Sequence, residues 1–414
     1  MKKTKEQFKV YLIAGCFPPF GRGNAITNMC VANGLAESFD VNVVCMQLEE
    51  GGLISYQDDP SLVKGLRSNI IVERVKGAKW FGINTLFYML GIFPCYFLNW
   101  AYNVVKQRDR LFEKPGVVFA VYPVFSDLII GYIISKNLGW PLLVDFRDDF
   151  SGVMSRSWRR IFRPLYKFLE KKIILKASHI TATTEGLKND LLNRYGLVEE
   201  KISVVYNIVP ESSGKIRKIG PDQIINHPLN ILYAGAMSAV QRPEILLLAN
   251  KYLCESESGW IDRVRIDFYG PMNPYFRMKV RSCLTKNCSY NGFVPQNVIS
   301  DKLRETDIGF FSLSDSTYSY ATPTKLFDYI ETGVPIVASL PHGASRLIIE
   351  DYKIGLVADV GDVEGLAIQV KRMVENQNLR DECRNNMIKI RTVFSTKSQI
   401  DKWKDVIVDL NNRD

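Results

Sequence analysis

The stretch Tyr320-Ala-Thr-Pro-Thr-Lys-Leu-Phe-Asp-Tyr-Ile-Glu-Thr-Gly-Val-Pro335 predicts one short helix with well-marked ends. We expect Thr322 to be its N-cap and Pro323 to occupy its first position, because proline lacks an N–H that the first turn would leave unpaired. Gly333 follows the last turn and is typical of a helix C-cap. A helix of this kind, preceded by a buried strand, belongs to an α/β fold.

The first turn of this helix favours a bound phosphate. Its free N–H groups and dipole attract an anion, the Thr322 hydroxyl can donate to it, and Lys325 adds a full positive charge. Asp328 lies one turn further on the same face, where its carboxylate can accept hydrogen bonds from ribose hydroxyls. The alternative is a well-capped core helix with a Lys–Asp pair at the surface.

Short apolar runs alternate with longer amphipathic runs on both sides of this helix. This alternation is typical of repeated strand-helix-strand units and of parallel sheets. The expected strands are Val10–Ala14, Val41–Met46, Ile70–Val75, Val117–Tyr122, Leu142–Phe146, Ile180–Thr183, Ile202–Tyr206, Ile231–Ala234, Val264–Tyr269, Ile308–Leu313, Ile336–Ser339 and Gly355–Ala358.

The alternation predicts an α/β chain of two doubly wound, Rossmann-like domains. Periodicity is lost and turn formers gather over residues 208–228, so we place the linker there, between domains of residues 1–207 and 229–396. A last helix, about 397–414, is expected to pack back onto the first domain. In such sheets ligands bind at the carboxyl ends of the strands where the winding reverses, so two facing copies would form a cleft.

Composition is consistent with this division and limits the function. A chain of 414 residues with 46% apolar and 23% charged residues suits two folded domains. The net charge of +9 favours an anionic partner, either a phosphorylated substrate, a membrane surface or nucleic acid. Eight scattered cysteines and three isolated histidines offer no metal cluster and favour a cytoplasmic setting. The N-terminal apolar run stops at Phe17-Pro18-Pro19, which is too early for an export signal.

Five motifs occur in the order and at the approximate spacing of one family: Tyr233-Ala-Gly235, Phe268-Tyr-Gly270, Asn291-Gly-Phe-Val294, Pro323-Thr-Lys325 and Asp328 through Pro335. In these motifs the chain resembles the GT-B glycosyltransferases, in particular the retaining, nucleotide-sugar-dependent enzymes of the family 4-like or group 1 type. The resemblance implies a GT-B fold and a nucleotide-sugar co-substrate, with no metal and no further cofactor.

The resemblance also assigns donor-binding positions. It implies that Lys325 and Arg242 hold the diphosphate and that Val294 contacts the base; a solvent-facing arginine is the alternative for Arg242. It further implies that the glycine loop with Gly21 and Gly23 touches the donor phosphates and the acceptor, although a simple strand-to-helix turn would also explain two glycines.

This sequence departs from the family at two donor positions. The family holds its donor with a pair of glutamates, the second on the ribose and the first toward the sugar. Here Asp328 takes the ribose position, with the same chemistry, and Tyr320 stands where the first glutamate would be.

The segment Leu143-Val-Asp-Phe-Arg-Asp-Asp-Phe150 ends a buried strand with a cluster of charges that suits an active-site edge. From the family pattern we expect Asp148 to face the acceptor hydroxyl and Arg147 to face a phosphate or the acceptor. The alternative is an Arg–Asp network that only locks the loop. In a retaining mechanism the leaving phosphate can take the acceptor proton, so no separate base is required.

Two segments predict contact with a membrane surface. Residues 80–105 carry no charge before Lys106 and are rich in aromatic residues, but glycine, proline and asparagine interrupt them, which favours an interfacial hairpin over a membrane-spanning helix. Residues 156–176 gather eight basic residues against the single acid Glu170, a pattern that suits anionic lipid headgroups. A solvated basic helix is the alternative, and nucleic acid is disfavoured because no recognised nucleic-acid-binding fold accompanies the charge.

These patterns together predict a metal-independent hexosyltransferase at the inner face of the cytoplasmic membrane. Its acceptor would be a lipid-linked saccharide of bacterial surface polysaccharide synthesis. Two alternatives stay open: a nucleotide-sugar epimerase of the same fold, and a degenerate homologue that serves as a membrane assembly partner.

Overall fold

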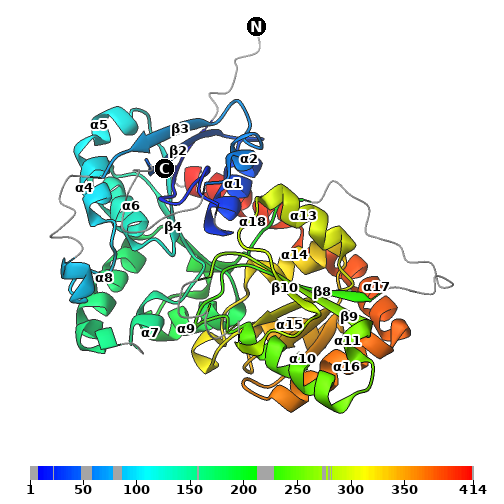
Figure 1. Cartoon of the computed structure of the whole chain (residues 1–414). Coiled ribbons are helices and arrows are strands. Elements are labelled where there is room, and N and C mark those ends of the chain that lie inside the picture. The colour runs from blue at the N-terminus through cyan, green and yellow to red at the C-terminus, as the bar shows by residue number, and fades with distance from the viewer. Residues whose placement is uncertain are drawn as a thin grey trace, which may run out of the picture. The chain divides into compact units, whose positions relative to one another are not determined.

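The computed structural model describes residues 8–21, 23–47, 58–77, 86–155, 158–211, 228–272, 277, 280 and 282–412. The chain divides into two compact units, a first unit of Met1–Pro210 with Thr396–Asp414 and a second unit of Glu211–Ser395 (Figure 1). Most of the expected linker, 208–228, lies outside the described residues.

The first unit is built on a seven-stranded parallel sheet in the order β3-β2-β1-β4-β5-β6-β7. Each strand expected in this half of the sequence is present, and its ends are shifted by at most two residues. The strands are β1 (Lys9–Ile13), β2 (Asp40–Met46), β3 (Ile71–Val75), β4 (Gly116–Tyr122), β5 (Leu142–Phe146), β6 (His179–Ala182) and β7 (Ile202–Val204).

Helices connect these strands. The connections are α1 (Gly23–Leu35), α2 (Pro60–Val63), α4 (Leu98–Lys106), α5 (Arg108–Leu111), α6 (Phe125–Leu138), α7 (Phe150–Ser155), η1 (Trp158–Phe162), α8 (Arg163–Lys176), α9 (Glu185–Tyr195) and η2 (Glu199–Lys201). The central strands β1, β4 and β5 are buried along nearly their whole length and are mostly apolar, as expected when both faces of a parallel sheet are covered.

The last helix, α18 (Thr396–Asn411), completes the core of the first unit. Its apolar stripe of Ile400, Trp403, Ile407 and Leu410 is buried with the residues of β1, β2 and α1. The Trp403 indole N–H donates to the Thr181 hydroxyl at 3.2 Å, which joins this helix to β6.

The second unit has a six-stranded parallel sheet in the order β10-β9-β8-β11-β12-β13. Its strands are β8 (Leu229–Ala234), β9 (Val264–Tyr269), β10 (Cys288–Tyr290), β11 (Ile308–Ser312), β12 (Ile336–Ser339) and β13 (Gly355–Ala358). The sequence analysis missed β10, a three-residue edge strand that is only half-buried and so carries no apolar signal.

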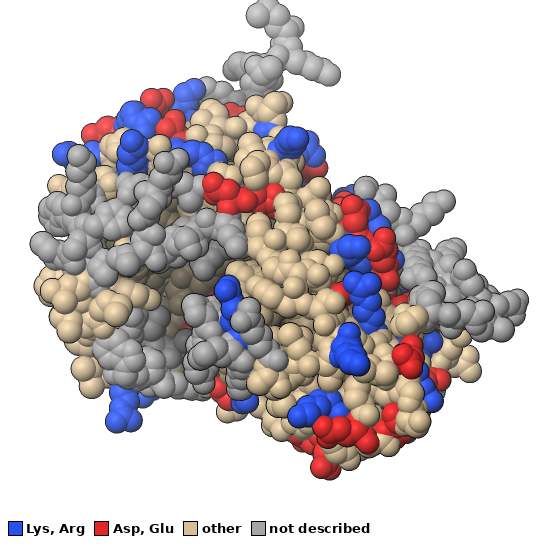
Figure 2. Space-filling view, in the orientation of Figure 1, with Lys and Arg blue, Asp and Glu red and all other residues tan. Residues whose placement is uncertain are grey.

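Helices of the second unit follow the expected alternation. They are α10 (Glu244–Ser256), α11 (Trp260–Arg263), α13 (Gln296–Glu305), η3 (Ser316–Tyr318), α14 (Thr324–Thr332), α15 (Ala344–Asp351), α16 (Val363–Glu375) and α17 (Gln377–Phe394). Figure 2 shows basic and acidic side chains intermingled over the part of this unit that carries α10 and α11.

Both sheets reverse their winding once, between β1 and β4 in the first unit and between β8 and β11 in the second. This confirms two doubly wound, Rossmann-like units. In sheets of this kind ligands bind at the carboxyl ends of the strands beside such a reversal, because the loops that leave the two neighbouring strands run in opposite directions.

Candidate functional site

Helix α14 begins beside the reversal point of the second sheet, after β11 and the η3 turn. Its N-cap position is occupied by Pro323, with φ −58° and ψ 148°, and no side chain caps it. The expectation that Thr322 caps the helix is therefore wrong by one residue, because Pro323 is still extended and the helix starts at Thr324. Gly333 ends the helix in the left-handed conformation, as expected.

Lys325 in the first turn of α14 is a buried cation with a neutral partner. Its side chain is 8% exposed, and its Nζ donates to Gln241 Oε1 at 2.7 Å and lies 5.0 Å from the centroid of the Tyr233 ring. Burial lowers the pKa of Lys325 to about 8, and only the charge of Asp328 opposes that shift. No carboxylate among the described residues bonds to Lys325, so its positive charge is suited to an incoming anion.

Gly235 makes room for this lysine at the end of β8. A Cβ at Gly235 would lie 2.4 Å from Lys325 Cε, and the residue has φ 145°, which L side chains rarely adopt. Gly270 at the end of β9 is held as closely, because a Cβ there would lie 2.1 Å from the Gly235 carbonyl oxygen. Close packing therefore explains why glycine occupies both of these positions.

Asp328 lies one turn along α14 from Lys325 and is partly exposed. Burial raises the pKa of Asp328 to about 7, and the charge of Lys325 opposes that rise. Within the part of the chain that the structure describes, no group donates a hydrogen bond to this carboxylate. It is thus placed to accept hydrogen bonds from a ligand.

Arg242 follows Gln241 in the loop between β8 and α10. It has φ 39°, a left-handed conformation that is uncommon outside glycine and often found at functional sites. Its guanidinium is 45% exposed and its Nε donates to the buried carboxylate of Glu244 at 3.3 Å. Because Gln241 contacts Lys325, this loop brings the two cations to the same end of the sheet.

Two further predicted donor residues of the second unit, Val294 and Tyr320, lie on loops of this unit. Val294 is partly buried between β10 and α13, in a loop whose Gly292 carbonyl accepts from the Gly270 N–H at 2.7 Å. Tyr320, also partly exposed, stands between two clamped residues: Ala344 N–H donates to the Ser319 carbonyl at 2.7 Å and Ser345 Oγ to the Ala321 carbonyl at 2.6 Å.

In the first unit, the glycine loop leaves β1 at that sheet's reversal point. Gly21 is partly buried, and Gly23 is the exposed first residue of α1. The Gly15 N–H donates to Asp127 Oδ2 at 2.8 Å, and burial raises the pKa of Asp127 well above its usual range. The sequence analysis missed Asp127; a carboxylate in the first turn of the apolar helix α6 was the available signal.

Arg147, predicted to face a phosphate or the acceptor, is turned into the protein. It is 6% exposed; its Nε donates to Asp145 Oδ2 at 2.7 Å and its Nη1 to Asn28 Oδ1 at 2.9 Å. Asp145 also accepts from the Thr181 hydroxyl at 2.6 Å. These contacts correspond to the loop-locking alternative, since the guanidinium does not reach the surface. Asp148, the next residue, is partly exposed.

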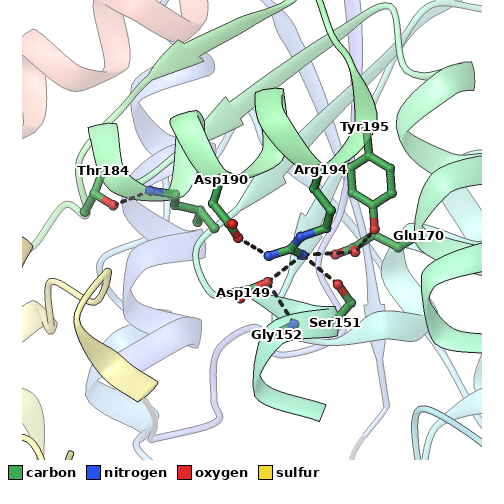
Figure 3. A network of polar contacts seen from close by, with 9 residues as sticks. Asp149, Ser151, Gly152, Glu170, Thr184, Asp190, Arg194 and Tyr195 are labelled. Atoms are coloured by element: carbon green, nitrogen blue, oxygen red, sulfur yellow. Dashed lines mark hydrogen bonds and ion pairs between the residues drawn. The ribbon is translucent and has the colours of Figure 1, made fainter. Parts of the chain in front are cut away.

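A second buried ion cluster surrounds Arg194 on α9 (Figure 3). Its Nη1 donates to Asp149 at 2.9 Å and to Ser151 at 2.6 Å, and its Nη2 donates to the Asp190 carboxylate. Glu170 of α8, fully buried, accepts from Arg194 and from the Tyr195 hydroxyl. The cluster fixes α7 and α8 to α9, and the signal for it was the lone acid among the bases of residues 156–176.

Two doubly wound, Rossmann-like units in one chain are the architecture of the GT-B fold. Sequence comparison agrees. Residues 217–390 match the family "Glycosyl transferases group 1" and residues 31–213 match "Glycosyltransferase Family 4". The chain belongs to these group 1, family 4-like glycosyltransferases. No curated protein sequence matches it significantly.

Solved structures support the fold. HepE from Anabaena, solved with UDP and glucose, superposes with a TM-score of 0.70 at 13% identity over 97% of this chain and 100% of its own. A sucrose-phosphate synthase from Thermosynechococcus elongatus gives 0.72 at 12% identity, covering 99% and 100%. WaaG, a glycosyltransferase of lipopolysaccharide biosynthesis, gives 0.63 at 15% identity, covering 96% and 99%. At these identities the likeness establishes the fold alone.

Proposed function

We propose that this glycosyltransferase moves a hexose-type sugar from a nucleoside-diphosphate sugar to a hydroxyl of a lipid-linked saccharide, with retention of configuration. The main support for binding of a nucleotide-sugar donor is Lys325, a buried cation with a neutral partner at the start of α14. HepE has been solved with UDP and with UDP-glucose, which supports a nucleotide-sugar as the donor class.

In this proposal Lys325 and Arg242 hold the donor diphosphate and Asp328 holds the ribose. The helix N-terminus adds its unpaired N–H groups at the phosphates. As the glycosidic bond breaks, negative charge grows on the leaving nucleoside diphosphate, and the two cations stabilise it without a metal ion. Val294 contacts the base through its backbone, and Tyr320 faces the sugar.

On the acceptor side, Asp148 is the partly exposed acid beside the locked Arg147 loop. We assign it to orient the acceptor hydroxyl, whose proton passes to the leaving phosphate. Gly21 and Gly23 let the backbone approach the donor phosphates and acceptor closely. WaaG acts in lipopolysaccharide biosynthesis, which supports an acceptor in a bacterial surface polysaccharide and a place at the inner face of the cytoplasmic membrane.

The test is incubation of the purified protein with UDP-, GDP- and dTDP-sugars and lipid-linked saccharide acceptors, with a chelator present. Transfer that depends on Lys325 and persists with the chelator supports the proposal. An epimerised nucleotide-sugar formed without acceptor would replace it with an epimerase. Failure to bind any nucleoside diphosphate would leave the protein as a non-catalytic assembly partner.

A further inference from the structure

Helix α8 exposes an apolar stripe on the side away from the core of the first unit. Leu165, Phe168 and Leu175 are 40%, 53% and 54% exposed, and their spacing places them on one face. Tyr166 and Glu170, on the opposite face, are fully buried. The helix therefore carries large apolar side chains on its outer side in addition to its buried inner side, which is unusual for a helix at a protein surface.

Basic side chains border this outer stripe. Lys172 lies with its Nζ 4.4 Å from the centroid of the Phe168 ring, and Lys171 is exposed beside it. Among the described residues, no acid pairs with any of the cations of α8, which are Arg163, Lys167, Lys171, Lys172 and Lys176. The one acid of the helix, Glu170, faces inward and is used by Arg194 and Tyr195.

Helix α13 of the second unit shows the contrasting, ordinary arrangement. There Lys302 pairs with Glu305 at 3.0 Å and Arg304 with Asp301 at 2.7 Å. Such pairs balance the charge of a solvated helix. The positive charge of α8 lacks this balance and accompanies exposed apolar side chains. A solvated basic helix would account for the exposed cations but not for the exposed apolar stripe beside them.

A neighbouring segment extends the apolar surface. Leu86, Met89 and Leu90 are 56%, 65% and 49% exposed, and the Tyr166 hydroxyl of α8 donates to the carbonyl of Gly91, which follows them. Helix α6 contacts both α8 and α4, so these elements form one flank of the first unit (Figure 1). In the described part of the chain no helix is long and apolar enough to cross a membrane.

We propose that the outer face of α8 lies in the interface of an anionic phospholipid bilayer, with Leu165, Phe168 and Leu175 among the acyl chains and the flanking lysines at the lipid phosphates. An amphipathic helix lying in the plane of the interface has this combination of inserted apolar residues and basic borders. Long lysine side chains can extend from beside an apolar stripe to the headgroups. This proposal rests on the proposed function, because it identifies the lipid surface at which the lipid-linked acceptor would be reached.

The experiment is sedimentation of the full chain with vesicles of neutral phosphatidylcholine alone or mixed with anionic phosphatidylglycerol. We expect binding to the anionic vesicles and a loss on the order of tenfold in partitioning for Leu165→Gln/Phe168→Gln. Lys171→Gln/Lys172→Gln should weaken binding mainly at low salt, because headgroup attraction is screened. Ile368→Gln, an exposed apolar residue of α16, is the matched control and should bind as the native chain does.

A nucleotide thermal shift of each variant shows whether it is folded and separates this proposal from the donor site. A variant that keeps its shift with nucleoside diphosphate and loses the vesicles supports the proposal, whatever the acceptor is found to be. Equal binding by the native chain and the α8 variants would overturn it, as would self-association in the absence of lipid that these variants abolish. Loss of nucleotide binding by the native chain would count against the proposed function, and vesicle binding would still be read on its own.

Discussion

Lys325 and Arg147 are both buried cations at the carboxyl end of a parallel sheet, yet their partners differ. Arg147 donates to the carboxylate of Asp145 and to Asn28, inside a network that reaches Thr181. Among the residues that the structure describes, Lys325 donates to the neutral amide of Gln241 and to no carboxylate. Removing one partner of a buried ion pair leaves an uncompensated charge, so we expect Arg147 to stabilise the fold, whereas we propose that the charge of Lys325 serves an anionic ligand.

The largest expected effect is on stability at Arg147. Arg147→Met leaves the Asp145 carboxylate buried without its cation, so we expect the free energy of unfolding to fall by about 3–5 kcal/mol. Denaturant unfolding measures it. The matched control is Arg110→Met, whose pair with Glu73 is half-exposed and should change stability by at most about 1 kcal/mol. Equal effects of the two substitutions would mean that the buried Arg147–Asp145 pair does not stabilise the fold more than an exposed pair does.

The next effect is on the position of Lys325. Gly235→Ala places a methyl group against Lys325 Cε on a backbone that alanine rarely adopts. We expect nucleoside diphosphate affinity to fall roughly tenfold or more, because the lysine must move to relieve the contact. Gly139→Ala is the control: its φ of 77° is also positive but no atom lies within 4 Å of the added Cβ, so it should strain the backbone and leave binding unchanged.

The strands and the candidate residues of α14 could be predicted from the sequence, but the contacts that surround Lys325 could not. Apolar runs located all but one of the strands, because a buried parallel strand must be apolar over most of its length. Lys325 and Asp328 followed from helix spacing. The contacts of Lys325 with Gln241 and Gly235 join residues about ninety positions apart, and local patterns do not encode such packing.

Arg147 and Asp148 illustrate the other limit. Adjacent charges after a buried strand suit an active site and an internal ion network equally well, and only side-chain direction separates them. Arg147 points into the core and Asp148 stays partly exposed. Likewise, the sequence pattern did not predict β10, because this strand is short and half-buried and has no apolar run.

A smaller effect is expected at the neutral partner. Gln241→Glu gives Lys325 the carboxylate that Arg147 already has, so the lysine should become engaged by the protein. We expect donor affinity to fall several-fold, on the order of 1 kcal/mol, while the pKa of Lys325 rises. Calorimetric titration with nucleoside diphosphate measures it, and Gln241→Met, which removes the amide without adding charge, should lose less.

The smallest effect is the pH dependence of donor affinity. Burial raises the pKa of Asp328 to about 7 and lowers that of Lys325 to about 8. Affinity should therefore rise as pH rises through 7, when Asp328 ionises, and fall as pH rises through 8, when Lys325 loses its proton. The folded-state pKa of Lys325 lies below its unfolded value, so the unfolded chain binds more protons above about pH 8 and stability from this group increases there. If the pH dependence of donor affinity were the same in Lys325→Met as in the native chain, the assignment of Lys325 to the donor diphosphate would be contradicted.

The most direct test of the account is nucleoside diphosphate binding by Lys325→Met beside Lys302→Met. Lys302 is a surface lysine of α13 paired with Glu305. We predict that Lys325→Met loses affinity roughly a hundredfold while its free energy of unfolding stays within about 1 kcal/mol of the native chain, as expected for a charge held for a ligand. Lys302→Met should bind normally. Unchanged affinity in Lys325→Met, or unfolding as severe as that of Arg147→Met, would contradict the assignment of Lys325 to the donor diphosphate.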